Sequence, residues 1–165
     1  MVLRLFIIFI LKFSFFSCSK KEAIYSSSES IDPYKSYNQG LEAFEKNQFF
    51  FAHKKFSEAE LNFKQVELAA KSAIMSSFSL YGINFYSEAL ENLERYLKNY
   101  PSDRFVIYAH YLISIIYFEQ IADEKKDLDP LIKANDKINF FLAKYPNTEY
   151  ALDLKFKKDL IQNQL

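Results

Sequence analysis

Apolar residues recur every three or four positions through residues 32–165, which is the spacing of one face of an α-helix. One such stripe consists of Ala89, Leu93, Tyr96 and Leu97. Strand signals are weak, because valine is rare and no Asn-Gly or Asp-Gly hairpin turn occurs in the sequence. The pattern therefore predicts an all-α domain over residues 32–165.

Proline, glycine and short polar residues indicate where the predicted helices begin and end. Asp32-Pro33 and Asp129-Pro130 each place an N-cap acceptor before a proline that suits the first helical position. Gly82 is expected to take the left-handed conformation that ends a helix, and a Tyr-Pro pair stops two further helices. These breaks predict helices over residues 33–46, 48–63, 66–81, 84–99, 103–122, 130–144 and 148–165.

Three of the predicted helices share a register of small and large apolar residues. An alanine is followed by a large apolar residue four positions later, by another apolar residue after seven, and in two helices by proline after twelve. This is the register of the second helix of a tetratricopeptide (TPR) repeat, where the alanine lets two helices approach closely and the proline ends the pair. The three sets are Ala52, Phe56 and Ala59; Ala89, Leu93, Tyr96 and Pro101; and Ala134, Ile138, Phe141 and Pro146.

The register predicts a TPR-like right-handed superhelix of three helical hairpins and one further helix, with an ordinary all-α bundle as the alternative. Ala89 and Ala134 lie 45 positions apart, more than the repeat length of about 34 residues. The excess predicts a lengthened first helix and an inserted loop within residues 118–129. The last helix has no following helix to cover its apolar residues, so they are expected to be either exposed or covered by another subunit. These residues are Ala151, Leu154, Leu160, Ile161 and Leu165.

Residues 1–17 form a short apolar segment that predicts a cleaved lipoprotein signal peptide. Arg4 gives the segment a basic start, and Lys12 interrupts it, so it falls short of the roughly 20 apolar residues that span a bilayer. Cys18, the single cysteine, follows directly, as in a bacterial lipobox, and we expect it to carry lipid such as palmitate. The alternatives are an ordinary signal peptide with an incidental cysteine, or a buried thiol. The polar, serine-rich residues 18–31 then form a flexible tether.

Composition and charge argue against most enzymes and against nucleic-acid binding. Lys plus Arg and Asp plus Glu each number 21, so the chain lacks the basic excess of a nucleic-acid binder. Two glycines exclude a glycine-rich phosphate loop, and one cysteine excludes an intrachain disulfide. His53 and His110 lie too far apart for metal-ligand spacing, and no nucleophile motif accompanies them. We therefore expect no catalytic residue, no metal and no cofactor. The alternative hypothesis from the class of enzymes is a lipoprotein with hydrolytic activity.

The first helix of each predicted hairpin supplies a candidate binding groove. A tyrosine ring offers contact area while its hydroxyl can bond a peptide backbone, so tyrosine tolerates a half-wet groove. Tyr37, Tyr81 and Tyr108 are the predicted groove residues, with interhelix core as the alternative. The other inward-facing positions of these helices are Tyr34, Leu41, Phe44, Ile74, Phe78, Phe105, Leu112 and Ile115.

Three stretches resemble the BamD (ComL) family of outer membrane protein assembly factors. They are YSEALENLERYLKNYP at residues 86–101, YAHYLISIIYF at residues 108–118 and YPNTEYALDLK at residues 145–155, of which the last is the most specific. The resemblance covers about residues 15–165. Because family members are larger, five-repeat proteins, we expect a shortened or truncated member that lacks most of the half that docks on the barrel subunit.

The resemblance implies a lipid-anchored periplasmic TPR adaptor of the outer membrane β-barrel assembly (BAM) machinery, which assists assembly and insertion of outer membrane proteins. Its partners would be the machinery's barrel subunit, other BAM lipoproteins and the C-termini of unfolded outer membrane proteins. Ser19 after the cysteine favours the outer membrane, since the lipoproteins retained in the inner membrane carry aspartate there. A periplasmic TPR scaffold of the cell envelope or division machinery is the alternative function.

Overall fold

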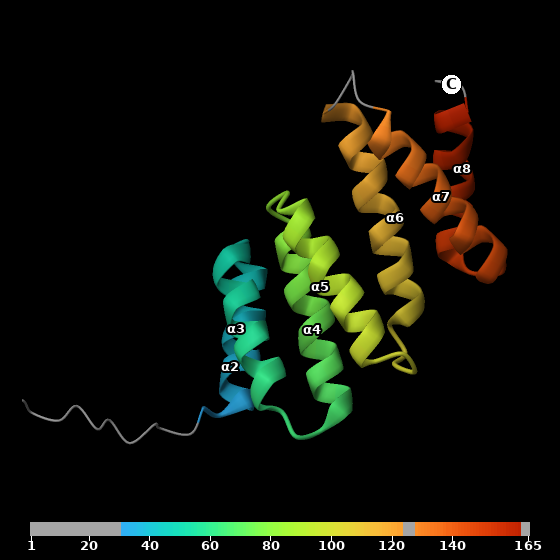
Figure 1. Cartoon of the computed structure of the whole chain (residues 1–165). Coiled ribbons are helices and arrows are strands. Elements are labelled where there is room, and N and C mark those ends of the chain that lie inside the picture. The colour runs from blue at the N-terminus through green and yellow to red at the C-terminus, as the bar shows by residue number, and fades with distance from the viewer. Residues whose placement is uncertain (1–30, 124–127, 163–165) are drawn as a thin grey trace, which may run out of the picture. The chain divides into compact units, whose positions relative to one another are not determined.

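The computed structural model describes residues 31–123 and 128–162, and the predicted signal peptide, Cys18 and nearly all of the tether lie outside these residues. In this part of the chain the structure has seven α-helices and no strand, which confirms the all-α prediction (Figure 1). Not one of these helices is long and apolar enough to cross a membrane. The helices are α2 (Pro33–Glu45), α3 (Phe49–Asn62), α4 (Val66–Tyr81), α5 (Tyr86–Asn99), α6 (Val106–Asp123), α7 (Asp129–Lys144) and α8 (Glu149–Gln162).

Each helix packs on the next one along the chain, so that α2–α3, α4–α5 and α6–α7 form hairpins and α8 packs on both α7 and α6. The short turns between helices dictate this order, because they leave two successive helices no room to separate. As predicted, α6 is the longest first helix, with 18 residues against 13 in α2 and 16 in α4.

The alanine register predicted from the sequence marks where the paired helices meet. Ala52, Ala89 and Ala134 are completely buried, and so are the residues four and seven positions after each of them. The first hairpin contains a close contact of this kind, where Gly40 of α2 lies against the ring of Phe56 of α3. A small residue at these positions lets the helix backbones approach, and the large residues one and two turns later fill the layer behind them.

Helix ends follow the sequence signals in part. The Asp32 carboxylate caps α2 by accepting a hydrogen bond from the Tyr34 amide (3.0 Å), as predicted. Asp129 was expected to be an N-cap, but it is the first residue of α7 and pairs with Lys133 one turn later (2.7 Å). The carboxylate is stabilised there by the positive end of the helix and by the ammonium together.

The left-handed residue after α4 is not the one expected. Gly82 has φ of −62°, an ordinary right-handed conformation, and Asn84 has φ of +59° instead. Asn47 takes the same conformation in the α2–α3 turn, with φ of +56°. Asparagine tolerates this region better than other side-chain-bearing residues, so a glycine is not required at either turn.

The prediction of uncovered apolar residues on the last helix is correct for Leu160 and wrong for three others. Ala151, Leu154 and Ile161 are buried in the layer that α8 shares with α6 and α7, because α8 packs against both helices. The large apolar side chains exposed on α8 are Leu160, as predicted, and two that were not predicted, Leu152 and Phe156; the three are spaced four residues apart on one face. Leu165 lies outside the described residues.

Candidate peptide-binding groove

One aromatic side chain from each first helix joins a continuous row across the repeats. Phe44 of α2, Phe78 of α4, Tyr108 of α6 and Tyr150 of α8 follow one another, and we call them the aromatic row. Successive ring centroids lie 5.6, 6.3 and 5.8 Å apart, within the range of favourable aromatic contacts. All four rings are half-buried, so each keeps part of its surface free for a ligand.

The aromatic row borders a hollow of about 400 Å³ on the face made by the first helices. A second hollow of about 470 Å³ adjoins it and shares Phe105, Tyr108 and Tyr150. Both volumes suit one or two large side chains of an extended segment. The residues lining the first hollow are Phe44, Lys71, Ile74, Met75, Phe78, Phe105, Tyr108 and Tyr150.

The hydroxyls of Tyr108 and Tyr111 remain neutral at physiological pH. Burial, followed by the neighbouring hydroxyls of Tyr150 and Tyr81, raises the pKa of Tyr108 to about 12. Burial also raises the pKa of Tyr111, whose hydroxyl donates to the Asp153 carboxylate (3.0 Å) while its ring stacks on Tyr150 (4.6 Å). The Tyr111 contact fixes the orientation of Tyr150, and the neutral Tyr108 hydroxyl can both donate and accept a hydrogen bond.

The structure places the three predicted groove tyrosines at different distances from the hollow. Tyr108 lines both hollows. Tyr81 packs its ring on Phe78 of the row (5.9 Å). Tyr37 packs on Phe56 inside the first hairpin, and the ammonium of Lys71, which lines the hollow, lies 5.2 Å from its ring centre. All three side chains are half-buried.

Three residues that line the first hollow were not predicted from the sequence: Tyr150, Lys71 and Met75. Tyr150 lies in the YPNTEY string, in the helix that opens a fourth repeat unit, so extending the first-helix rule to that helix would have found it. Lys71 carries no such signal, because a lysine on a helix is ordinarily a solvated surface residue. Only its place beside the aromatic row distinguishes it.

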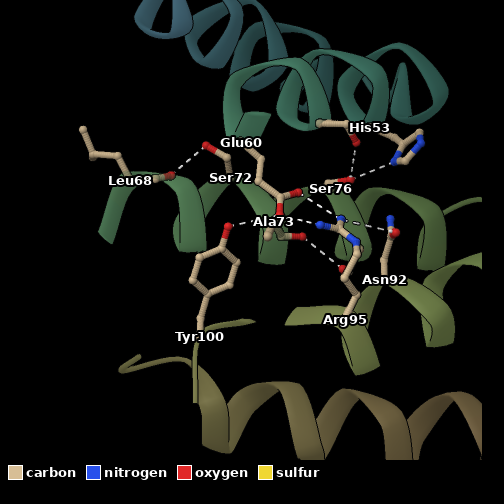
Figure 2. A network of polar contacts seen from close by, with 11 residues as sticks. His53, Glu60, Leu68, Ser72, Ala73, Ser76, Asn92, Arg95 and Tyr100 are labelled. Atoms are coloured by element: carbon tan, nitrogen blue, oxygen red, sulfur yellow. Dashed lines mark hydrogen bonds and ion pairs between the residues drawn. The ribbon is translucent and has the colours of Figure 1, made fainter. Parts of the chain in front are cut away.

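A polar network ties the two hairpins together on the other side of α4 (Figure 2). Glu60 of α3 is buried and accepts two hydrogen bonds from the Arg95 guanidinium of α5, one of them 2.9 Å long. The Tyr100 hydroxyl donates a third hydrogen bond to Glu60 (3.2 Å). Pairing with the Glu60 carboxylate also raises the pKa of Arg95. The network therefore satisfies a buried carboxylate, and its role is to hold α3 and α5 in register.

The same network contains a serine–histidine pair, which in an open site would suggest nucleophilic chemistry. His53 Nδ1 lies 2.8 Å from Ser76 Oγ, and Ser57 Oγ lies 2.9 Å from the same oxygen. Ser76 is completely buried between helices, so a substrate has no access to its oxygen. Burial lowers the pKa of His53, which keeps the imidazole neutral. Over residues 31–123 and 128–162, no three His, Cys, Asp or Glu side chains gather as metal ligands.

Comparison with known proteins places this arrangement among outer membrane proteins. The family model YfiO, described as an outer membrane lipoprotein, matches residues 29–165. The outer membrane protein assembly factor BamD of Caulobacter vibrioides is 33% identical over 129 residues, which are 78% of this chain and 42% of the relative. BamD of Rickettsia prowazekii is 27% identical over 129 residues, or 78% of this chain and 51% of the relative. The chain thus spans about half the length of these relatives.

Proposed function

Because this chain belongs to the YfiO family of outer membrane lipoproteins, we propose that it is a lipid-anchored periplasmic adaptor that assists assembly and insertion of outer membrane proteins. The names of both relatives, outer membrane protein assembly factor, support this role. The adaptor acts by binding and needs no turnover. Its partners are the barrel subunit of the assembly machinery, other lipoproteins of that machinery and unfolded outer membrane proteins.

The observation that carries the peptide-binding part of the proposal is the aromatic row beside a hollow. The row takes one ring from each of four first helices, which matches the length of an extended peptide segment better than that of a small ligand. The ligands are extended segments from the aromatic-ended C-termini of outer membrane barrels. Affinity is modest, because a flexible peptide loses conformational entropy when the groove orders it.

A titration with a labelled peptide tests this binding. A fluorescent peptide taken from the C-terminus of an outer membrane barrel is expected to bind the purified full chain. Replacing Tyr37, Tyr81 and Tyr108 together by alanine is expected to abolish binding while the far-UV circular dichroism remains helical. The matched control is Phe50→Ala, which removes an exposed ring (63% exposed) away from the hollow.

The two negative outcomes of this titration have different meanings. If the wild-type chain binds no such peptide, the assembly role loses its main support and the envelope-scaffold alternative gains. If the triple variant binds as well as wild type, the peptide uses another face of the molecule. Binding that falls with the Phe50 control as strongly as with the triple variant would point to non-specific aromatic contacts.

The anchor is proposed at Cys18, which follows the apolar residues 1–17. We expect cleavage before Cys18, acylation of its thiol and amino group, and a location on the periplasmic face of the outer membrane. Mass spectrometry of membrane-extracted protein is expected to find an acylated N-terminal cysteine, and Cys18→Ala is expected to leave the chain unprocessed. An N-terminus elsewhere without an acyl chain would contradict the anchor.

A further inference from the structure

The hollow beside the aromatic row contains one charged side chain in an otherwise apolar lining. Of its eight lining residues, seven are aromatic or aliphatic, and the eighth is Lys71. Lys71 is half-buried on α4, one turn before Met75 and two turns before Phe78. Lys71 therefore adds one positive charge to a lining that otherwise suits the apolar part of a ligand.

Within the described residues, Lys71 forms no salt bridge with a carboxylate. Its ammonium instead lies over the ring of Tyr37, 5.2 Å from the ring centre. A ring face stabilises a cation far less than a carboxylate does when both are shielded from water. The ammonium is therefore poised to take an anionic group from a ligand that displaces water from the hollow.

Two carboxylates share a second hollow with Lys71, and no salt bridge joins either of them to Lys71. Glu67, one turn earlier on α4, is exposed to water and lines a separate hollow of about 560 Å³ into which Lys71 also reaches. Asp103 lines that separate hollow too, but its carboxylate accepts hydrogen bonds from the Tyr96 hydroxyl and the Phe105 amide (3.0 Å). Both acids lie outside the lining of the aromatic hollow.

We infer that Lys71 recognises the C-terminal carboxylate of the bound peptide; this inference rests on the peptide-binding function proposed for the groove. The terminal aromatic side chain packs into the hollow against Phe44, Phe78 and Tyr108, and the free α-carboxylate pairs with the Lys71 ammonium. The α-carboxyl group has a pKa of about 3.5, so it is ionised at neutral pH. An internal segment offers only a neutral backbone at this position, and the groove therefore distinguishes a C-terminus from an internal sequence.

The test compares one peptide in three forms on the wild-type full chain. The first is a ten-residue peptide that ends in phenylalanine with a free carboxylate, and the second is its C-terminal amide. The third is the amide with an aspartate added at the opposite end, which restores the net charge. Fluorescence anisotropy is expected to show both amides binding roughly tenfold to a hundredfold more weakly than the free acid, as the loss of one charged hydrogen bond implies.

Variants of Lys71 then identify the residue responsible. Lys71→Gln is expected to weaken binding of the free acid by the same factor and to leave binding of the amide unchanged. Lys71→Arg, which keeps the charge, is expected to restore most of the preference for the acid. Lys98→Gln, on the exposed surface of α5, is the matched control and is expected to leave the affinity for both peptides unchanged.

Each contrary outcome has its own meaning. If the free acid and the amide bind equally well, the groove binds peptides but does not recognise their C-terminal carboxylate. The role of Lys71 is then overturned, while the proposed function stands. If neither peptide binds, the proposed function and the role of Lys71 fall together. If dodecanoate binds with the same dependence on Lys71 while the acid has no advantage over the amide, the hollow is a site for a lipid anion, which overturns the peptide-end assignment.

Discussion

Gly40 of α2 lies so close to Phe56 of α3 that a Cβ atom added at Gly40 would come within 2.7 Å of two ring carbons. The Phe56 ring is completely buried, so it has no free space into which it could move. This close contact between the two helices of the first hairpin therefore depends on the absence of a side chain at Gly40.

Gly40→Ala is accordingly expected to destabilise the protein, although alanine favours a helix by about 1 kcal/mol over glycine. The overpacking cost of about 1–3 kcal/mol equals or exceeds that gain, so the free energy of unfolding should fall by up to about 2 kcal/mol. Gly82→Ala is the matched control, because its Cβ would meet the half-buried Phe49 at 3.3 Å and Gly82 already has a right-handed backbone. Urea denaturation measures both; equal effects would show that the Gly40 contact is not the cause.

The buried alanines of the second helices give a parallel prediction. Ala89 and Ala134 are completely buried where paired helices meet, so Ala89→Leu and Ala134→Leu should each lower the free energy of unfolding by about 1–3 kcal/mol. Ala143→Leu, at an exposed position of the same helix as Ala134, is the control and should be nearly neutral. Thermal melts that do not change in either buried variant would contradict the close-approach register.

Local periodicity made the helices and their contact residues predictable. The register around Ala52, Ala89 and Ala134 requires only that apolar residues recur at helical spacing, and burial of these residues is the direct consequence. The backbone conformation of single turn residues was less predictable. Gly82 and Asn84 both tolerate the left-handed region, so the sequence alone does not select between them, and in the structure Asn84 adopts it.

Contacts between residues far apart in the chain were not predictable from spacing. Glu60 and Arg95 are separated by 35 positions and lie on different hairpins, so each one alone looks like a solvated charge. Lys71 was missed for the same reason, because its role depends on rings supplied by other helices. In the groove, the first-helix rule found Tyr108, and the same rule applied to the helix that opens a fourth repeat unit would have found Tyr150.

The Glu60–Arg95 pair should contribute to stability mainly because Glu60 would be costly to leave unpaired. Arg95→Met removes two hydrogen bonds from a carboxylate that is almost fully buried, so the free energy of unfolding should fall by about 1–3 kcal/mol. Glu60→Gln should lower the free energy of unfolding by less than Arg95→Met does, because the partly exposed Arg95 guanidinium can be hydrated by water instead.

The double variant separates pairing from packing. Glu60→Gln combined with Arg95→Met should be no less stable than Arg95→Met alone, since the neutral amide no longer requires a cationic partner. Urea denaturation of all four proteins gives the coupling free energy between the two sites. Strictly additive losses would mean that the ion pair contributes nothing beyond the packing of its two side chains.

The lowered pKa values of the two histidines predict how the free energy of unfolding depends on pH. Burial lowers the pKa of His53, and burial together with Lys144 and Lys137 lowers the pKa of His110. In the unfolded chain both imidazoles titrate near pH 6.5, so the unfolded state binds more protons than the folded state in mildly acidic solution. Their contribution to stability is therefore complete above about pH 6.5 and is lost as the pH falls through the lower folded-state values.

Urea denaturation at pH 7.5 and at pH 5.5 checks this dependence. Wild type should be less stable at pH 5.5, and a variant with both His53→Gln and His110→Gln should lose clearly less stability between the two pH values. Glu42→Gln is the control, because pairing with Lys46 lowers the Glu42 pKa from 4.5, so this carboxylate stays ionised at both pH values. A double variant with the same loss as wild type would show that other groups govern acid stability in this range.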